Sequence, residues 1–239
     1  MRYFILVIVF AFFNLYSIAQ AASYSDPAAA YLKVMLEKGG EGTYQQIGSF
    51  KVIGTSYLFG DRLMGSVYAG KEKSEKVSLG YNMYNQELDI YASPTSSSSK
   101  ISRSVATIDS FVVFASQSEF LTQDLFFYRS SLLKSDLKEC FLQMVCKGNR
   151  FTLFKAYSAV FDYVSTNYIQ SDLRQFSIEY NYYYLDATTQ QLKKLKLSRK
   201  KMIDEFKSVK DIGPYYNNET FDLNPELSLK NIFNALNAQ

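Results

Sequence analysis

The sequence predicts a mainly β protein: an antiparallel sandwich or partly open barrel built from hairpins, with a short N-terminal helix and a helical C-terminal section. Three observations carry this prediction. Short apolar segments separated by turn signals recur between residues 77 and 197 without helical periodicity. The 20 tyrosines and 19 phenylalanines favour pleated, half-buried strands. The last forty or so residues change to the spacing of amphipathic helices.

The first 21 residues have the features of a secretory signal peptide. Arg2 provides a positive start, residues 4–18 are almost entirely apolar, and residues 19–21 form a small-x-small cleavage signal. The apolar run is shorter than the roughly 20 residues that a comfortable transmembrane helix needs. We expect an exported protein, in the periplasm, associated with the outer membrane or secreted, with no transmembrane segment left after removal of the signal.

A β-rich domain is expected over residues 22–197, and it begins with a short helix. Asp26 is a suitable N-cap, Pro27 fits the first helical position, and Gly39 with Gly40 ends the pattern. The apolar residues between them follow helical spacing: Ala28, Tyr31, Leu32 and Met35.

The clearest hairpin is predicted around Asn85 and Gln86. The apolar residues of 77–83 alternate with one parity and those of 88–92 with the other, so one strand cannot hold both sets. A two-residue turn resolves this by pairing Met83 with Leu88 and placing both sets on one face.

Further strands are expected over five segments: residues 101–108, 111–115, 125–133, 137–147 and 150–164. Gly148 and Asn149 are typical of a hairpin turn. A second hairpin is predicted between 177–185 and 190–197, across residues 186–189.

The helical section is expected over residues 198–239, packed on the sheet. Ser198 can cap a first helix and Asn224-Pro225 can open a second one. Each helix has one apolar stripe, formed by Met202, Ile203, Phe206 and Val209 in the first and by Leu229, Ile232, Phe233 and Leu236 in the second.

The amino-acid composition excludes several kinds of catalytic and binding site. The chain has no histidine, which excludes Ser-His-Asp and Cys-His nucleophile systems and zinc-protease helices. A formal net charge of +3 gives no strong attraction to nucleic acid, so no nucleic-acid partner is expected. Cys140 and Cys146 are favoured as separate buried thiols, because six residues of one strand would hold them roughly 20 Å apart. No metal site and no cofactor are expected.

Six cations close together form the sharpest charge feature of the sequence: Lys193, Lys194, Lys196, Arg199, Lys200 and Lys201. They are a candidate patch for an anionic partner such as a lipid head group or an acidic glycan. The alternative is an ordinary solvated surface, with Lys200–Asp204 and Lys201–Glu205 as i, i+4 pairs.

Tyrosines cluster near the second hairpin and are candidate ligand-binding rings. Strand alternation places Tyr180, Tyr182 and Tyr184 on one side and Tyr183 on the other. Exposed rings on one concave surface would suit a sugar or a small ligand, whereas buried rings would be ordinary core.

The chain also resembles a group of uncharacterised exported proteins of the Bacteroidota. The resemblance lies in the glycine and Tyr-Asn pattern over residues 54–58, 65–67 and 77–88, and in the residues 182–185 and 193–196 followed by a lysine-rich helix. It implies an envelope location and a β-rich fold, and it implies no catalytic residue.

These observations favour an exported, non-enzymatic cell-envelope protein that binds another envelope component, a protein or a glycan. The alternative is a glycan or small-ligand binding module that uses exposed tyrosines. A carboxylate-based hydrolase is a third reading, and it requires two acids roughly 5 to 10 Å apart in a pocket.

Overall fold

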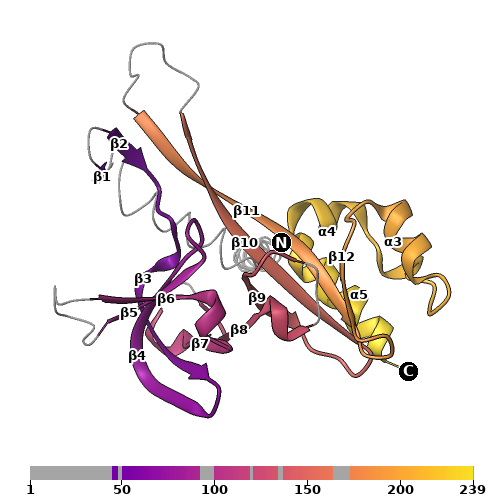
Figure 1. The fold of residues 1–239 in the computed structure, drawn as a ribbon. Helices are drawn as coiled ribbons and strands as arrows, with labels where there is room; N and C mark the ends of the chain where they lie inside the picture. The colour runs from indigo at the N-terminus through magenta and orange to yellow at the C-terminus, as the bar shows by residue number, and fades with distance from the viewer. Residues whose placement is uncertain are drawn as a thin grey trace, which may run out of the picture.

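The computed structural model describes residues 45–47, 50–91, 100–118, 121–133, 137–163 and 173–238. The predicted signal peptide and the predicted N-terminal helix lie outside the described residues. Within them the protein is mainly β with a helical C-terminal section, as the sequence predicts (Figure 1).

Twelve strands form one sheet. The strands are β1 (Gln45–Ile47), β2 (Phe50–Ile53), β3 (Tyr57–Ala69), β4 (Glu72–Asn82), β5 (Glu87–Tyr91), β6 (Lys100–Ser104), β7 (Ser110–Val113), β8 (Leu125–Arg129), β9 (Phe141–Cys146), β10 (Phe151–Tyr163), β11 (Leu173–Asp186) and β12 (Gln191–Lys194). The helices are α3 (Arg199–Phe206), α4 (Asn218–Leu223) and α5 (Pro225–Asn237). Single 3-10 turns occur at Val105–Thr107, Ala115–Gln117, Ser130–Leu133 and Gly213–Tyr215.

The strand order is β1-β2-β11-β10-β9-β8-β7-β3-β4-β5-β6, and β12 also pairs with β11. The sheet is open, because in the described part of the chain its end strands β1 and β6 do not pair with each other. The predicted all-antiparallel arrangement needs one correction, since β2 runs parallel to β11. This pair is brought together from distant parts of the chain, so local turn signals cannot reveal it. The sandwich or partly open barrel stays a prediction.

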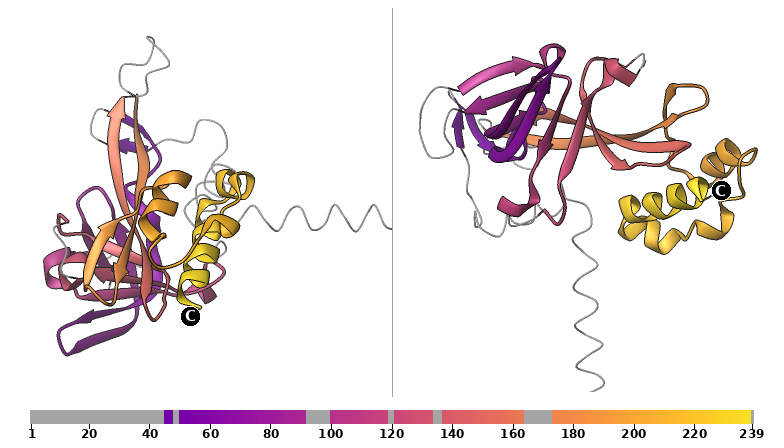
Figure 2. Two further views of the ribbon diagram at one scale, coloured as in Figure 1. Left: turned by 90° about the vertical axis from the view of Figure 1, so that its right-hand side faces the viewer. Right: turned by 90° about the horizontal axis from the view of Figure 1, so that it is seen from below.

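The long hairpin β10–β11 is the spine of the molecule. It is paired over its whole length, from Phe151–Asp186 to Tyr163–Arg174. The N-terminal strands lie toward one end of this spine and the C-terminal helices toward the other, as the views in Figure 2 show. The predicted hairpins across 148–149 and 186–189 are both confirmed, by the pairs β9–β10 and β11–β12.

The predicted hairpin around residues 85–86 is also confirmed, but its register is wrong by two residues. Leu88 pairs with Tyr81, where the sequence predicted Met83. The connection is longer than two residues because Asn82 accepts hydrogen bonds from the backbone N–H groups of Tyr84 and Asn85, and Gln86 has φ +57°. A two-residue shift keeps every side chain on its predicted face.

Two apolar clusters lie along the same face of the spine. The first is formed by strands β3–β5, β7 and β8 with the adjoining parts of β9 and β10, and Phe111 and Phe127 stack at its centre with ring centroids 4.4 Å apart. The second lies between the spine and the C-terminal helices. A smaller third cluster, which includes Leu142, Phe154 and Tyr183, covers the opposite face.

The C-terminal helices bury the stripes that the sequence predicts. Met202 and Phe206 of α3 are buried, as are the four stripe residues of α5. The Asn224 side chain caps α5 by accepting a hydrogen bond from the Leu227 N–H. Ser198 precedes α3 as predicted, but its side chain makes no capping hydrogen bond. Helix α4, capped by Asn217, was not predicted because its single turn and a half is too short to show a period.

Both cysteines are free, as favoured from the sequence, although each is half-buried and not fully buried. No helix among the described residues is both long enough and apolar enough to cross a membrane.

Candidate functional site

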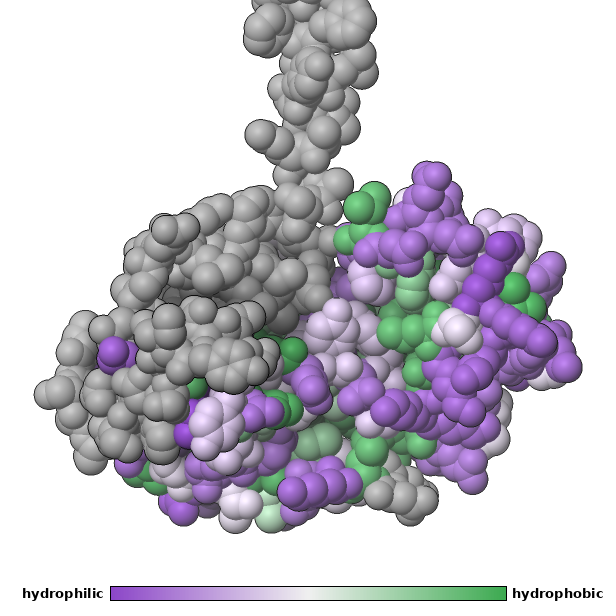
Figure 3. All heavy atoms as spheres, turned by 90° about the horizontal axis from the view of Figure 1, so that it is seen from above, coloured by the Kyte–Doolittle hydropathy of each residue, from purple (hydrophilic) through white to green (hydrophobic). Residues whose placement is uncertain are grey.

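The six predicted cations form an exposed surface at the β12–α3 connection, which we call the basic strip: Lys193, Lys194, Lys196, Arg199, Lys200 and Lys201. Strand pairing holds Lys193 opposite Tyr184 and Lys194 opposite Tyr183. The intervening Leu195 is buried in the second cluster, and its N–H donates to the Tyr182 carbonyl. Figure 3 shows hydrophilic side chains gathered over this C-terminal end of the molecule.

The expected i, i+4 pairs are not formed. Among the residues that the structure describes, none of the six cations lies within 4.0 Å of a carboxylate. One of the two predicted acids, Glu205, is instead the acceptor for the Tyr184 hydroxyl. The charges of the basic strip are therefore available to an external anion. They lie as close together as the sequence indicated.

The three tyrosines predicted to bind a ligand have different environments. Tyr180 is 39% exposed, but Tyr182 and Tyr184 are only 1% and 3% exposed. The Tyr184 ring packs on Phe206 and Phe233, with centroids 5.2 and 6.2 Å away. The expected surface of exposed rings is therefore not present, because the C-terminal helices cover this end of β11. Burial and the hydrogen bond to Glu205 raise the pKa of Tyr184.

A buried ion pair lies between the two large clusters. Lys155 of β10 is fully buried, and its Nζ lies 3.2 Å from Glu226 Oε2 at the start of α5. The same ammonium stands 4.1 Å from the centre of the Tyr180 ring. Lys230, one turn further along α5, lies 3.2 Å from the other Glu226 oxygen. This pair joins the helical section to the spine, and nothing in the sequence signals it because 71 residues separate its members.

A second polar cluster surrounds Asp89 on β5. The side chain is 1% exposed and accepts hydrogen bonds from Lys100 at 2.8 Å, from Ser102 at 2.5 Å and from the Tyr57 hydroxyl. Burial opposes ionisation of Asp89, but these donors outweigh it and lower the pKa of the carboxyl. Burial and the bond to Asp89 raise the pKa of Tyr57, so its hydroxyl is a donor and not a base. The arrangement ties β3 and β6 to β5 and offers no free nucleophile.

We expect Asp89→Asn to reduce the free energy of unfolding by about 1.5–3 kcal/mol at neutral pH, since it removes hydrogen bonds to a charged group. The folded-state pKa is lowered, so this stabilisation is complete above the unfolded-state pKa of about 3.9 and is lost as the pH falls below it. Urea unfolding at several pH values should show the two proteins converging in stability on acidification. A difference that stays constant with pH would contradict the role of the ionised carboxylate.

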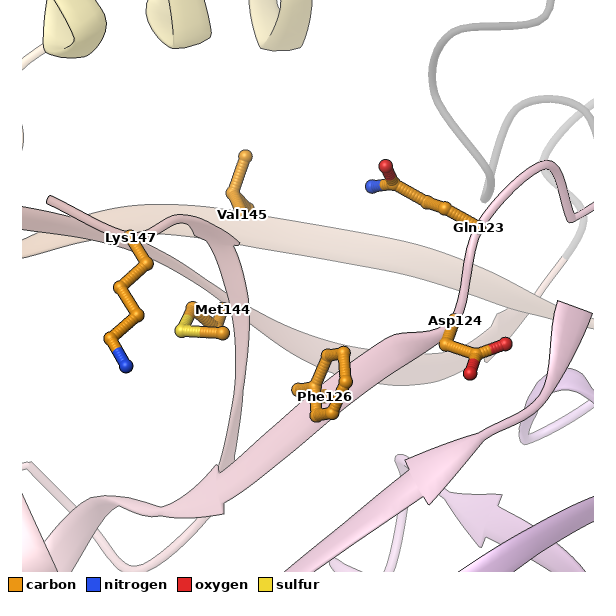
Figure 4. A pocket seen from close by; sticks show the side chains of 6 residues that line it. All are labelled: Gln123, Asp124, Phe126, Met144, Val145 and Lys147. Atoms are coloured by element: carbon orange, nitrogen blue, oxygen red, sulfur yellow. The ribbon is translucent and has the colours of Figure 1, made fainter.

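A concavity of about 410 Å³ lies over β8 and β9 (Figure 4). Phe126 and Met144 line its middle, with Lys147 at one end and Gln123 and Asp124 at the other. Asp124 already accepts a hydrogen bond from the Ala115 N–H. Among the described residues of its lining there is a single acid, so these residues do not supply the pair of carboxylates that a glycoside hydrolase needs.

The described part of the chain supports neither a metal site nor a reactive cysteine. No group of three or more Cys, Asp and Glu side chains there is placed to hold a metal ion. Burial raises the pKa of both Cys140 and Cys146, which keeps them as neutral thiols near pH 7.

Comparison with models of known protein families, with curated proteins and with solved structures gives no match to this chain.

Proposed function

We propose that the protein is an exported, non-enzymatic component of the cell envelope that binds a negatively charged envelope partner through the basic strip. The observation that carries this proposal is the availability of the strip: six exposed cations lie within nine residues, and none is neutralised by a carboxylate of the described residues. The N-terminal signal pattern and the resemblance to exported Bacteroidota proteins support the envelope location.

Buried neighbouring residues fix the backbone of the basic strip. This favours binding of a partner over the alternative of an ordinary solvated surface. Leu195, which lies between two of its cations, and Met202, which follows the last one, are 4% and 0% exposed in the second cluster. An anion that approaches the strip therefore meets charges whose backbone positions are already fixed, so less ordering entropy is lost on binding. The buried positions of Tyr182 and Tyr184 do not favour the alternative of a sugar-binding tyrosine face.

The test is a pull-down of the tagged protein from its own envelope after crosslinking, followed by mass spectrometry. We expect a stoichiometric partner with an acidic surface. The triple variant Lys193→Gln, Lys194→Gln, Lys196→Gln should reduce its recovery at least about tenfold, since each cation near an anionic surface contributes about 1 kcal/mol. Recovery should also fall as the salt concentration rises.

A matched variant removes the same charge elsewhere. Lys71, Lys73 and Lys76 are exposed at and after the β3–β4 turn, far from β12 in Figure 1. Replacing these three with Gln should leave recovery unchanged. Equal loss in both triple variants would show a general charge effect and would refute a role for the strip.

A further inference from the structure

The edge of β11 contains a gap between two strands. β2 pairs with one part of this edge, ending at the Gln175–Ile53 pair. β12 pairs with another part, and its last contact is the hydrogen bond from the Leu195 N–H to the Tyr182 carbonyl. Gly54, the residue after β2, lies beside the next position, because a Cβ added to it would stand 2.9 Å from the Phe176 carbonyl oxygen. Between Phe176 and Tyr182, no strand of the described residues lies beside this edge.

Ladder parity shows which backbone groups face the gap. Tyr182 bonds toward β12, and hydrogen bonding alternates along an antiparallel strand, so Ile178 and Tyr180 turn their N–H and C=O groups to the same edge. Their neighbours Ser177 and Glu179 bond toward β10 instead. In the described part of the chain, no backbone partner is found for the edge groups of Ile178 and Tyr180. The opening from Phe176 to Tyr182 spans six residue steps, roughly 20 Å, which accommodates a strand of about five residues.

The side chains beside the gap differ between the two faces. On the inner face, Phe176 and Ile178 pack against the first cluster and Tyr180 follows them. On the outer face, Ser177 and Glu179 are exposed. A strand that fills the gap would continue this pattern with apolar residues inside and polar residues outside.

The basic strip begins where the gap ends. Lys194 is the last residue of β12, and Lys196 leaves the edge one residue beyond Leu195. An added strand would meet these exposed cations with one of its ends. Antiparallel pairing with β11 is the more stable orientation, and it places the N-terminal end of the added strand beside Lys196.

From this juxtaposition we infer that the partner is a protein that inserts an extended segment into the gap of β11, with acidic residues preceding a stretch of alternating polar and apolar residues. Backbone hydrogen bonds to Ile178 and Tyr180 supply affinity, and the acidic end pairs with Lys194 and Lys196. This inference rests on the proposed function, because it names the chemistry of the partner that the basic strip binds.

The test uses a fluorescein-labelled, N-acetylated peptide of sequence Glu-Glu-Thr-Val-Thr-Val-Thr and the full chain, followed by fluorescence polarisation. Residues directly opposite each other in an antiparallel pair share a face, so the two valines should lie opposite Ile178 and Tyr180 and bond to them. N-methylation of the two valine amides should weaken binding at least tenfold. The matched control is N-methylation of the first and last threonine amides, which flank the Val-Thr-Val core and point away from β11. It should change binding less than threefold.

Two further measurements locate the peptide and separate this inference from the proposed function. Hydrogen exchange should slow at the Ile178 and Tyr180 amides when the peptide binds. Lys194→Gln with Lys196→Gln should weaken binding, whereas Lys71→Gln with Lys73→Gln should not. If both methylated peptides bind like the parent while the strip variant weakens all three, strand insertion is refuted and the anionic site stands. Absence of peptide binding combined with strip-dependent binding to phosphatidylglycerol vesicles also refutes strand insertion, and it identifies a lipid partner.

Discussion

Replacing Lys155 with Met should reduce the free energy of unfolding by about 3–5 kcal/mol, which is the usual cost of removing one member of a buried ion pair. The expected loss is large because Glu226 is 1% exposed and would lose its buried partner, which leaves it with the ion pair to Lys230. The ammonium also leaves the face of the Tyr180 ring. Urea unfolding followed by circular dichroism measures the change, and this method suits a chain without tryptophan.

Two control variants separate charge burial from the loss of lysine itself. Lys155→Met combined with Glu226→Gln should recover much of the lost stability, since no buried charge is left without its counterion. Lys138→Met removes an exposed lysine and should change stability by no more than about 0.5 kcal/mol. If the double variant is less stable than Lys155→Met alone, the buried pair does not explain the effect.

Gly65→Ala should be the second strongly destabilising substitution, with an expected loss of about 3 kcal/mol. Gly65 lies in the middle of β3 and pairs with Val77 on one side and Val113 on the other. A Cβ atom at this position would lie 2.1 Å from the Val112 carbonyl oxygen and 2.8 Å from a methyl group of Leu79. A backbone oxygen cannot rotate away as a side chain can, so the strand pairing itself has to open. Thermal or urea unfolding measures the loss.

Gly213→Ala provides the matched control for this position. Its added Cβ would come no closer than 3.0 Å to the end of the flexible Asp211 side chain, and Gly213 has no positive φ. We expect a change of at most about 0.5 kcal/mol. Equal effects of the two substitutions would show that glycine content in general, and not the close approach of β3 and β7, limits stability.

The sequence pattern and the structure differ most clearly in the β4–β5 hairpin. The parity switch between residues 77–83 and 88–92 was enough to predict two strands and the face of each side chain, because alternation is a local property. The register was wrong by two residues, because it depends on how Asn82 and Gln86 shape the turn. Stripe spacing likewise identified α3 and α5 but could not show which tyrosines they would cover.

Local sequence patterns were enough to predict the mainly β character, the three hairpins, the apolar stripes of the two longer C-terminal helices and the concentration of cations in the basic strip. All of these follow from the period and charge of neighbouring residues. Long-range contacts of the fold set four other features: the parallel pairing of β2 with β11, the burial of Tyr182 and Tyr184, the Lys155–Glu226 pair and the gap in the edge of β11. These features join residues that are far apart in the chain, and their free energy comes from contacts that no local pattern encodes.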